Sequence, residues 1–519
     1  MDIRRKRAIA RQMMFLGAPI LCQNIAISPY NSVMAYRGKK TIYLSGIGGI
    51  GMSALARWYK AQNWAVSGSD IVESGITGKL RKEGLKVHIG HKKSNINKEL
   101  GLLVYNRAIK PDNPELLAAK GLGVPILPYA KALGEITKNY TTIAITGSHG
   151  KSTTTALIGL ILLKAGFDPS VFVGTELKEF GGRNIRIGKG RHLVLEADDF
   201  GKAFLHYSPA MAVVTNIDRE HLDTYKNLKG AQKAFLQFIA RVTREGTVIL
   251  NSDDKNLFSL RSKIENIGRK NDLRIIWYSL RNPPALKVKR IIKIFGAHNL
   301  SNAIAAYTLA RALKIPETKI LKAIGAYRGA WRRMEYRGNA KFMVYGSWFM
   351  VRVYDDYAHH PTEIKATLQG LREKFPKAEI ICVFQPHQAK RLKLLFKEFM
   401  GAFNGAHKTL ILPVYEVAGR DNSTSPSAVS SGPNGSGHVS NKYDSQALVR
   451  AIQKQQPKKL IFYLENPKNL KAALTTLLSP AKNLDPRFRG DDPSGRLTHV
   501  IVMMGAGDIV NYTDSLIKP

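Results

Sequence analysis

A short segment at residues 146–155, TGSHGKSTTT, combines residue types that handle phosphate groups. It follows an apolar run, TTIAI, and precedes a helical pattern, ALIGLILLKAG. Gly147 and Gly150 let backbone N–H groups turn toward phosphate oxygens, and the start of the helix adds its positive end. Lys151 would reach the β- and γ-phosphates of a nucleotide, and the Ser152 hydroxyl would ligate Mg²⁺. The segment predicts a phosphate-binding loop, and the alternative is a plain glycine turn between strand and helix.

A second glycine-rich segment, GIGGIGMSALA, follows the β-rich run KKTIYLS. Gly46, Gly48 and Gly51 match the G-x-G-x-x-G pattern, and Gly49 lies between them. This pattern after a strand is typical of dinucleotide binding, with an acidic residue about 20 positions on that holds a ribose hydroxyl. Asp70 in SGSD is the candidate for that residue. The pattern alone fits NAD, another nucleotide or a tight turn.

Polar residues at the ends of other apolar runs could complete a site. Glu196 ends HLVLE, and a carboxylate at a strand end beside a phosphate loop is a natural Mg²⁺ ligand. His221 follows MAVVTNID closely enough to reach the same edge. His359 and His360 are neighbours in DDYAHHP and would point apart, so we expect at most one of them to face a substrate.

The elements that position these residues alternate between short apolar strands and helical segments. That alternation predicts an α/β fold with parallel, doubly wound sheets, in which ligands bind at the carboxyl ends of the strands. Three stretches have this rhythm, beginning near residues 38, 138 and 334. Two segments rich in Ser, Gly, Pro or charged residues, near 419–440 and 480–496, read as surface insertions.

The bulk composition excludes several classes of protein. A chain of 519 residues that is 44% hydrophobic is long enough for two to four globular domains. Its two cysteines, Cys22 and Cys382, cannot build a disulfide framework, which fits a reducing cytoplasm. The net charge of +40 would attract polyanions, but the lysines and arginines are spread along the chain and no nucleic-acid-binding module is recognisable. We therefore expect a basic, solvated surface and no nucleic-acid partner.

The first residues differ from the rest of the chain. MDIRRKRAIARQ is basic, and the apolar run MMFLGAPILC that follows is only 10 residues long. Roughly 20 apolar residues are needed to span a bilayer, so we expect no membrane insertion. Residues 1–37 read as a basic leader, disordered or not native, with Met34 as an alternative start, in preference to an export signal.

The motifs taken together resemble those of the Mur ligase family. TGSHGKSTTT, LEADD, TNIDREHLDTY, GAHNLSNAIAAY, GAWRRMEYRG, DDYAHHPTE and FQPH occur in the order typical of that family, after GIGGIGMSALA and AIKPDNPE. Within the family they are most similar to the members that add L-alanine to UDP-N-acetylmuramate. The resemblance covers about residues 38–415 and resumes near MMGAGDI.

This resemblance implies a cytoplasmic, ATP-dependent ligase of peptidoglycan precursor synthesis, monomeric or homodimeric, with ATP and Mg²⁺ as cofactors. ATP would phosphorylate the lactyl carboxylate of UDP-N-acetylmuramate, and L-alanine would attack the acyl phosphate. Three domains are implied: a Rossmann-like UDP-sugar domain (38–137), a central P-loop ATPase domain (138–333) and a Rossmann-like C-terminal domain (334–519) that closes over both. The alternatives are another Mur-type amide ligase with a different amino acid or peptide, a homologue that binds without turnover, and a basic ATPase stimulated by nucleic acid.

The resemblance also implies roles for individual residues. The catalytic candidates are Lys151, His221, Arg332, Arg333 and His360. The ATP-binding candidates are Gly147, Ser148, His149, Gly150, Lys151, Ser152 and Thr153, with Asn299 at the adenine and Asp356 at the ribose. The metal candidates are Ser152, Glu196 and His221, and the amino-acid candidates are His360 and Arg391. Gly46, Gly48, Gly49, Gly51 and Asp70 would hold the UDP-sugar in place of a dinucleotide.

Some positions depart from the family pattern. Ser148 and Ser152 stand where threonine is usual, a mild change because either hydroxyl can ligate Mg²⁺. Gln388 and Lys393 stand where arginines are frequent, which affects the amino-acid contacts. Related ligases carry a carbamylated lysine at the metal site; the motifs do not place one in this chain, and Lys233 is no more than one possibility.

Overall fold

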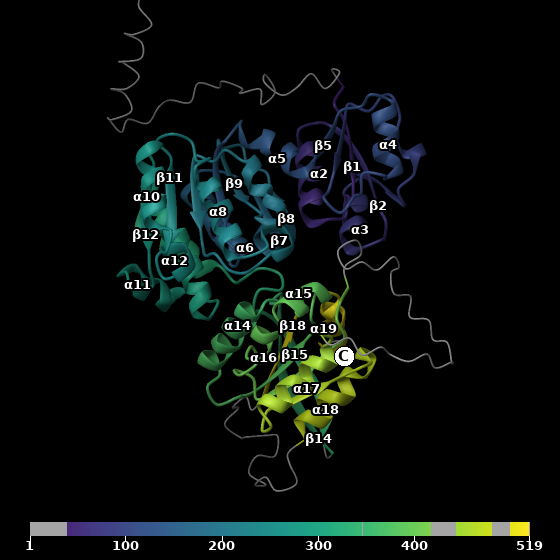
Figure 1. Ribbon diagram of the computed structural model, residues 1–519, viewed down its shortest axis with the longest axis vertical. Helices are drawn as coiled ribbons and strands as arrows, with labels where there is room; N and C mark the ends of the chain where they lie inside the picture. The colour runs from purple at the N-terminus through teal and green to yellow at the C-terminus, as the bar shows by residue number, and fades with distance from the viewer. Residues whose placement is uncertain (1–38, 345, 417–442, 480–498, 518–519) are drawn as a thin grey trace, which may run out of the picture. The chain divides into compact units, whose positions relative to one another are not determined.

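The computed structural model describes residues 39–344, 346–416, 443–479 and 499–517 (Figure 1). The predicted leader and the two predicted insertions lie outside these ranges, as does Cys22. The described residues form three α/β regions, each built on its own sheet. The predicted α/β class with three sheet-containing regions is confirmed, whereas the exact domain boundaries stay predictions.

The first region has five parallel strands in the order β3-β2-β1-β4-β5. This is the 3-2-1-4-5 order of a Rossmann-type sheet, whose strand order reverses between β1 and β4. Its strands are β1 Thr41–Ser45, β2 Ala65–Asp70, β3 Lys86–Ile89, β4 Leu102–Tyr105 and β5 Ile126–Pro128. Its helices, with η marking 3₁₀ turns, are α2 Ile50–Ala61, α3 Gly75–Lys82, η1 Lys93–Asn95, α4 Pro114–Gly121 and α5 Tyr129–Thr137.

The central region has seven strands in the order β12-β11-β10-β6-β9-β7-β8. Its strands are β6 Thr141–Thr146, β7 Ser170–Leu177, β8 Arg183–Arg186, β9 His192–Glu196, β10 Met211–Val214, β11 Thr247–Asn251 and β12 Arg274–Tyr278. Its helices are α6 Lys151–Ala165, η2 Lys178–Phe180, η3 Phe200–His206, α7 Leu222–Tyr225, α8 Leu228–Ile239, α9 Lys255–Phe258, α10 Arg261–Lys270, α11 Pro284–Ile291, α12 Ala297–Ala312 and α13 Glu317–Ala326.

The third region has six strands in the order β13-β14-β18-β15-β16-β17. Its strands are β13 Glu335–Val344, β14 Ser347–Asp356, β15 Glu379–Phe384, β16 Lys408–Ile411, β17 Leu460–Tyr463 and β18 His499–Met504. Its helices are α14 Pro361–Lys374, α15 Ala389–Leu394, α16 Phe396–Met400, α17 Ser445–Gln455, η4 Pro467–Asn469, α18 Leu470–Leu478 and α19 Ile509–Ile517.

Helix α6, which follows the phosphate-loop motif, is buried along nearly its whole length. It packs against β7 on one side and against α12 and α13 on the other. A helix that is apolar all round is stable only when it is covered on all sides, and ALIGLILL meets that condition here. The loop before α6 is therefore mounted on a rigid element of the central core.

Two strands depart from the expected all-parallel arrangement. β8 runs antiparallel to β7, and β13 runs antiparallel to β14. Both are edge strands, joined to their neighbours by short connections, and such a connection can join only antiparallel strands. Among the helices of the described ranges, none combines the length and the apolar character needed to cross a bilayer.

Candidate active site

The phosphate loop between β6 and α6 needs glycine at two positions. Gly147 has φ +138°, and a Cβ there would lie 2.0 Å from Thr215 Oγ1. Gly150 has φ +83°, and a Cβ there would lie 2.3 Å from Asn302 Oδ1. Since both side chains are buried against the loop, no larger residue fits without moving them. The two glycines predicted from the sequence are thus required by backbone conformation and by close packing.

Lys151 begins α6 and its ammonium group lies over the loop. Its Nζ donates hydrogen bonds to the carbonyl oxygens of Gly147 (2.6 Å) and Ser148 (3.2 Å) and pairs with Asp199 Oδ1 at 2.8 Å. Although burial opposes the charged form, the nearby carboxylates of Asp199 and Asp198 raise the pKa of Lys151 above its usual value. The ammonium is therefore charged at neutral pH and could pair with phosphate oxygens.

Ser152 and Glu196 form an oxygen-rich pair beside Lys151. The Ser152 hydroxyl donates to Glu196 Oε1 at 3.0 Å, and the Gly174 N–H donates to Glu196 Oε2 at 2.6 Å. Burial raises the pKa of Glu196, while the Gly174 N–H and the Lys151 charge oppose the rise. A hydroxyl and a carboxylate at this spacing fit Mg²⁺, which prefers oxygen ligands.

His221, the third metal candidate, lies beside Asp198 and Asp199 and not beside Ser152 and Glu196. Its Nε2 lies 4.0 Å from Asp199 Oδ1, and the ligand atoms of Asp198, Asp199 and His221 are close enough to share one metal ion. Asp199 also pairs with Lys151, whereas Glu196 bonds with Ser152. The structure thus brings Ser152 and Glu196 together directly and reaches His221 only through Asp199.

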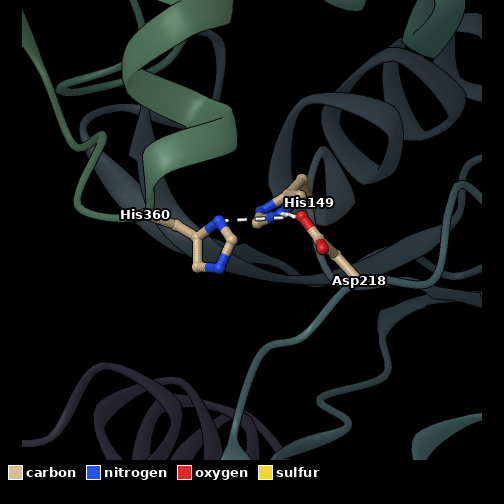
Figure 2. A group of neighbouring side chains, drawn as sticks. All are labelled: His149, Asp218 and His360. Carbon is tan, nitrogen blue, oxygen red and sulfur yellow. Dashed lines mark hydrogen bonds and ion pairs between the residues drawn. The ribbon is translucent and has the colours of Figure 1, made fainter. Parts of the chain in front are cut away.

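His149, in the phosphate loop, is held between two carboxylates. Its Nε2 donates to Asp218 Oδ2 at 2.9 Å and its Nδ1 donates to Glu363 Oε1 at 3.2 Å. Figure 2 shows His149 and His360 both directed toward Asp218, and His360 Nδ1 lies 3.6 Å from Asp218 Oδ2. Burial opposes protonation, but the two carboxylates raise the pKa of His149 to about 10. In the protonated form both ring nitrogens donate, so His149 is held as a cation between Asp218 and Glu363.

Arg332 and Arg333 are adjacent but differ in environment. Arg332 is buried, donates to Asp355 Oδ1 (3.2 Å) and Gly507 O (3.1 Å), and donates to Gly505 O as well. Its guanidinium group thus connects Asp355 in β14 with the loop that follows β18. Arg333 lies 5.0 Å from the ring of Tyr357, and its charge acts on site carboxylates that include Glu196 and Asp356. Arg333 is the better placed of the two for a phosphate.

The two residues predicted to contact adenosine are both buried. Asn299, in the first turn of α12, donates from Nδ2 to Phe295 O at 2.9 Å. Asp356, at the end of β14, accepts hydrogen bonds from the N–H groups of Met334 (2.7 Å) and Ala358 (2.8 Å). Burial raises the pKa of Asp356 to about 6, against the opposing effects of Arg333 and these N–H groups.

In the first region, a backbone N–H of the glycine loop bonds to the carboxylate of Asp70. The Gly48 N–H donates to Asp70 Oδ2 at 2.9 Å, so Asp70 contacts the loop, and its predicted role toward a ligand stays a prediction. Gly46 has φ +82°, and a Cβ on Gly51 would lie 2.7 Å from Tyr129 Oη. The loop therefore packs tightly at the carboxyl end of β1, where Rossmann-type sheets bind phosphate groups.

A cavity of about 360 Å³ lies beside His221. It is lined by residues 107–111, by Phe200, by residues 219–223, and by residues 388, 390, 391, 394 and 395. Arg391 is among them, and its Nη2 lies 2.5 Å from Glu220 Oε1. The cavity brings together His221 and Arg391, the metal-site and amino-acid candidates.

Several residues at the site were not predicted. Asn216 accepts the His149 N–H at 2.8 Å, and Asp218, Glu220 and Glu363 pair with predicted residues. Asn216, Asp218 and Glu220 all belong to TNIDRE, a mostly polar segment that directly follows the buried strand β10. A polar segment at the end of a buried strand was a readable signal for a second loop at the site.

A buried carboxylate in the first region was also missed. Glu115 is fully buried, and hydrogen bonds from its neighbours lower its pKa to about 2 although burial opposes ionisation. Its donors are Tyr43 Oη, Ser45 Oγ, Ser69 Oγ, His91 Nδ1 and Asn95 Nδ2. These groups join the ends of β1, β2 and β3 beside the glycine loop.

Comparison with known proteins identifies the family. Residues 41–141 match the domain described as Mur ligase family, catalytic domain; residues 145–310 match the Mur ligase middle domain; residues 332–480 match the Mur ligase, glutamate ligase domain. UDP-N-acetylmuramate–L-alanine ligase of Acetivibrio thermocellus is 40% identical over 401 residues, which cover 74% of this chain and 83% of the relative. The chain belongs to the Mur ligase family.

Other Mur ligases match over more of the chain. UDP-N-acetylmuramate–L-alanine ligase of Sulfurihydrogenibium sp. is 34% identical over 495 residues, covering 93% of this chain and 98% of the relative. The crystal structure of UDP-N-acetylmuramate-alanine ligase MurC from Thermotoga maritima covers 92% of this chain and 98% of its own, with a TM-score of 0.67 at 23% identity. A murein peptide ligase from Psychrobacter arcticus gives a TM-score of 0.61 at 19% identity, with the same coverage of each chain. The two structures establish that this chain has the three-domain Mur ligase fold.

Proposed function

We propose that this protein is a cytoplasmic ligase that joins L-alanine to the lactyl carboxylate of UDP-N-acetylmuramate in peptidoglycan precursor synthesis, at the expense of ATP. The observation that carries the proposal is the grouping of Lys151, Ser152 and Glu196 at the carboxyl ends of β6 and β9. Relatives that are 34–40% identical to the chain bear the name of this activity. A carboxylate is a poor electrophile, and ATP supplies the phosphoryl group that makes it reactive.

In the proposed site, the central region carries out phosphoryl transfer. Lys151 binds the β- and γ-phosphates, and Ser152 and Glu196 hold Mg²⁺, which neutralises charge on the phosphates. Arg333 braces the γ-phosphate, because its neighbour Arg332 is fully engaged with Asp355 and two carbonyl groups. Phosphoryl transfer depends on positioning and charge neutralisation more than on covalent catalysis, and this chain provides both.

The substrates occupy the two flanking regions in this proposal. The glycine loop at residues 46–51 binds the UDP diphosphate, with Asp70 as its acidic partner. Arg391 binds the carboxylate of L-alanine in the cavity beside His221, and His360 lies on the same side of the site. The amine of L-alanine attacks the acyl phosphate, and the tetrahedral intermediate collapses to amide and phosphate.

The test is release of ADP by the purified full-length protein with Mg²⁺. ADP release should require both UDP-N-acetylmuramate and L-alanine, and omission of either should reduce it to background. A panel with glycine, L-serine and a short peptide in place of L-alanine distinguishes this ligase from another Mur-type amide ligase. Equal ADP release without the sugar nucleotide, or stimulation by nucleic acid instead, would refute the proposal.

A further inference from the structure

Glu220 and Arg391 form a buried ion pair that the motifs did not predict. Arg391 Nη2 lies 2.5 Å from Glu220 Oε1, and the two side chains are 10% and 5% exposed. Although burial opposes its ionisation, the guanidinium of Arg391 holds the pKa of Glu220 well below its usual value. Removing one member of such a pair is costly, because it leaves an uncompensated charge in a poorly solvated place.

The pair is incompletely satisfied on the carboxylate side. Glu220 Oε2 is buried, and within the described part of the chain no donor makes a hydrogen bond to it. His360 Nε2 is likewise buried without a hydrogen-bond partner among the described residues, and it lies 3.8 Å from Glu220 Oε2. A buried acceptor without a donor costs about 1–3 kcal/mol, so its retention calls for an explanation.

Arg391 is anchored on its other side. Its Nη1 donates to His387 O at 3.3 Å and lies 3.3 Å from His387 Nδ1. The guanidinium is therefore held in place independently of Glu220 and would stay in position if that carboxylate moved. Glu220 and Arg391 both line the cavity of about 360 Å³, so a small ligand in the cavity meets both charges.

We propose that the Glu220–Arg391 ion pair is the resting state of a binding site for the zwitterion of a free α-amino acid. This inference rests on the proposed function and adds to it a partner for the ammonium group. The carboxylate of the amino acid takes the place of Glu220 on Arg391, and its ammonium group pairs with Glu220. The Glu220 oxygen that lacks a hydrogen-bond donor is the acceptor that faces the ammonium group.

Exchange of partners keeps both buried charges compensated. A zwitterion supplies one charge of each sign, so the ion pair can open without leaving either residue alone. A monocarboxylate opens the pair but leaves Glu220 without a cation, and a simple amine leaves Arg391 without an anion. Because an unpaired buried charge is strongly unfavourable, the site should reject both and accept only molecules that carry both groups.

The experiment compares L-alanine with propionate, which has the same carbon chain and lacks the amine. We measure the KM for L-alanine and the inhibition constant of propionate in wild type, Glu220→Gln and Glu398→Gln. Glu398 is the matched control, because it pairs with Arg219 at 2.5 Å in the same part of the molecule and is 38% exposed. Retained KM values for ATP and UDP-N-acetylmuramate establish that each variant is folded.

In wild type, propionate should inhibit at least about tenfold more weakly than L-alanine binds. In Glu220→Gln, the inhibition constant of propionate divided by the KM for L-alanine should fall by about tenfold or more. That fall is equivalent to about 1.4 kcal/mol of lost ammonium binding. Glu398→Gln should keep the wild-type ratio. If Glu220→Gln does not fold, Glu220→Asp, which keeps the charge on a shorter arm, should give an intermediate ratio. Wild-type inhibition by propionate at the concentrations at which L-alanine binds would overturn the proposal without any variant.

Two failures are distinguishable. Normal L-alanine-dependent turnover with an unchanged ratio in Glu220→Gln would overturn this inference and leave the proposed function standing. Wild-type ADP release that does not depend on L-alanine would overturn the proposed function and this inference with it.

Discussion

The buried cation at His149 predicts a specific dependence of stability on pH. Asp218 and Glu363 both accept hydrogen bonds from its imidazolium, and the pKa of His149 is raised to about 10, against about 6.5 for an unperturbed histidine. The folded state therefore binds the proton more tightly than the unfolded chain does. The resulting stabilisation is fully present below pH 6.5 and is lost as the pH rises through 10.

The size of the effect follows from the two pKa values. Between them, the contribution of the His149 proton to the free energy of unfolding falls by about 1.4 kcal/mol for each pH unit. From pH 7 to pH 9 this amounts to about 2 to 3 kcal/mol, since the unfolded chain is already mostly neutral at pH 7. His149 is only 14% exposed, so solvent screens the interaction little. For a region of this size the change corresponds to about 4 to 12 °C in melting temperature.

The assay is thermal unfolding of wild type and His149→Gln at several pH values from 7 to 9. At pH 7 the melting temperature of wild type should be higher than that of His149→Gln. At pH 9 the difference between the two melting temperatures should be smaller by about 4 to 12 °C. His298→Gln is the matched control, because burial lowers the pKa of His298 to about 4 and its imidazole stays neutral throughout. Curves for wild type and His149→Gln that stay parallel from pH 7 to 9 would refute the reasoning.

Further variants separate chemistry from structure. Lys151→Ala should abolish ADP release but keep the affinity for the sugar nucleotide, measured by calorimetry. It should also lower the free energy of unfolding by about 3 kcal/mol, because Asp199 is then buried without its cation. Adding Asp199→Asn should restore the melting temperature without restoring turnover, and a double variant as unstable as the single one would contradict this. Ser152→Thr should keep the Mg²⁺ requirement, whereas Ser152→Ala should raise the Mg²⁺ concentration for half-maximal rate by about tenfold. Arg332→Ala should lower the melting temperature by several degrees, and Arg333→Ala should lower turnover at an unchanged melting temperature.

Much of the fold and part of the site were predictable because their signals are local. Alternating apolar strands and helical segments indicate an α/β class, and the glycines at 147 and 150 mark a loop whose backbone has positive φ at both positions. The place of Asp70 near the glycine loop follows from the pairing of β2 with β1, whereas its bond to the Gly48 N–H was not predicted.

The remaining site could not be predicted, because its pairings join segments far apart in the chain. His149 and Glu363 are separated by 214 positions, and Glu220 and Arg391 by 171. A sequence shows that such residues are charged but not which charge each one meets after packing. Arg332 is an example. The motif that contains it predicted an arginine that binds phosphate, whereas in the structure Arg332 is buried in an ion pair with Asp355.

The loop after β10 connects the proposed phosphate site with the proposed amino-acid site. Alternate residues of this loop contact different parts of the site: Asn216 holds the phosphate-loop backbone, Asp218 holds His149, and Glu220 holds Arg391. Buried Ile217 anchors the same peptide, with its N–H donated to Asp254 and its carbonyl accepting from Asn256. These two hydrogen bonds fix the middle of the loop, so Asn216, Asp218 and Glu220 are held on one anchored segment. In the proposed function, the positions of the triphosphate site and the amino-acid site relative to each other therefore depend on a few covalently linked residues.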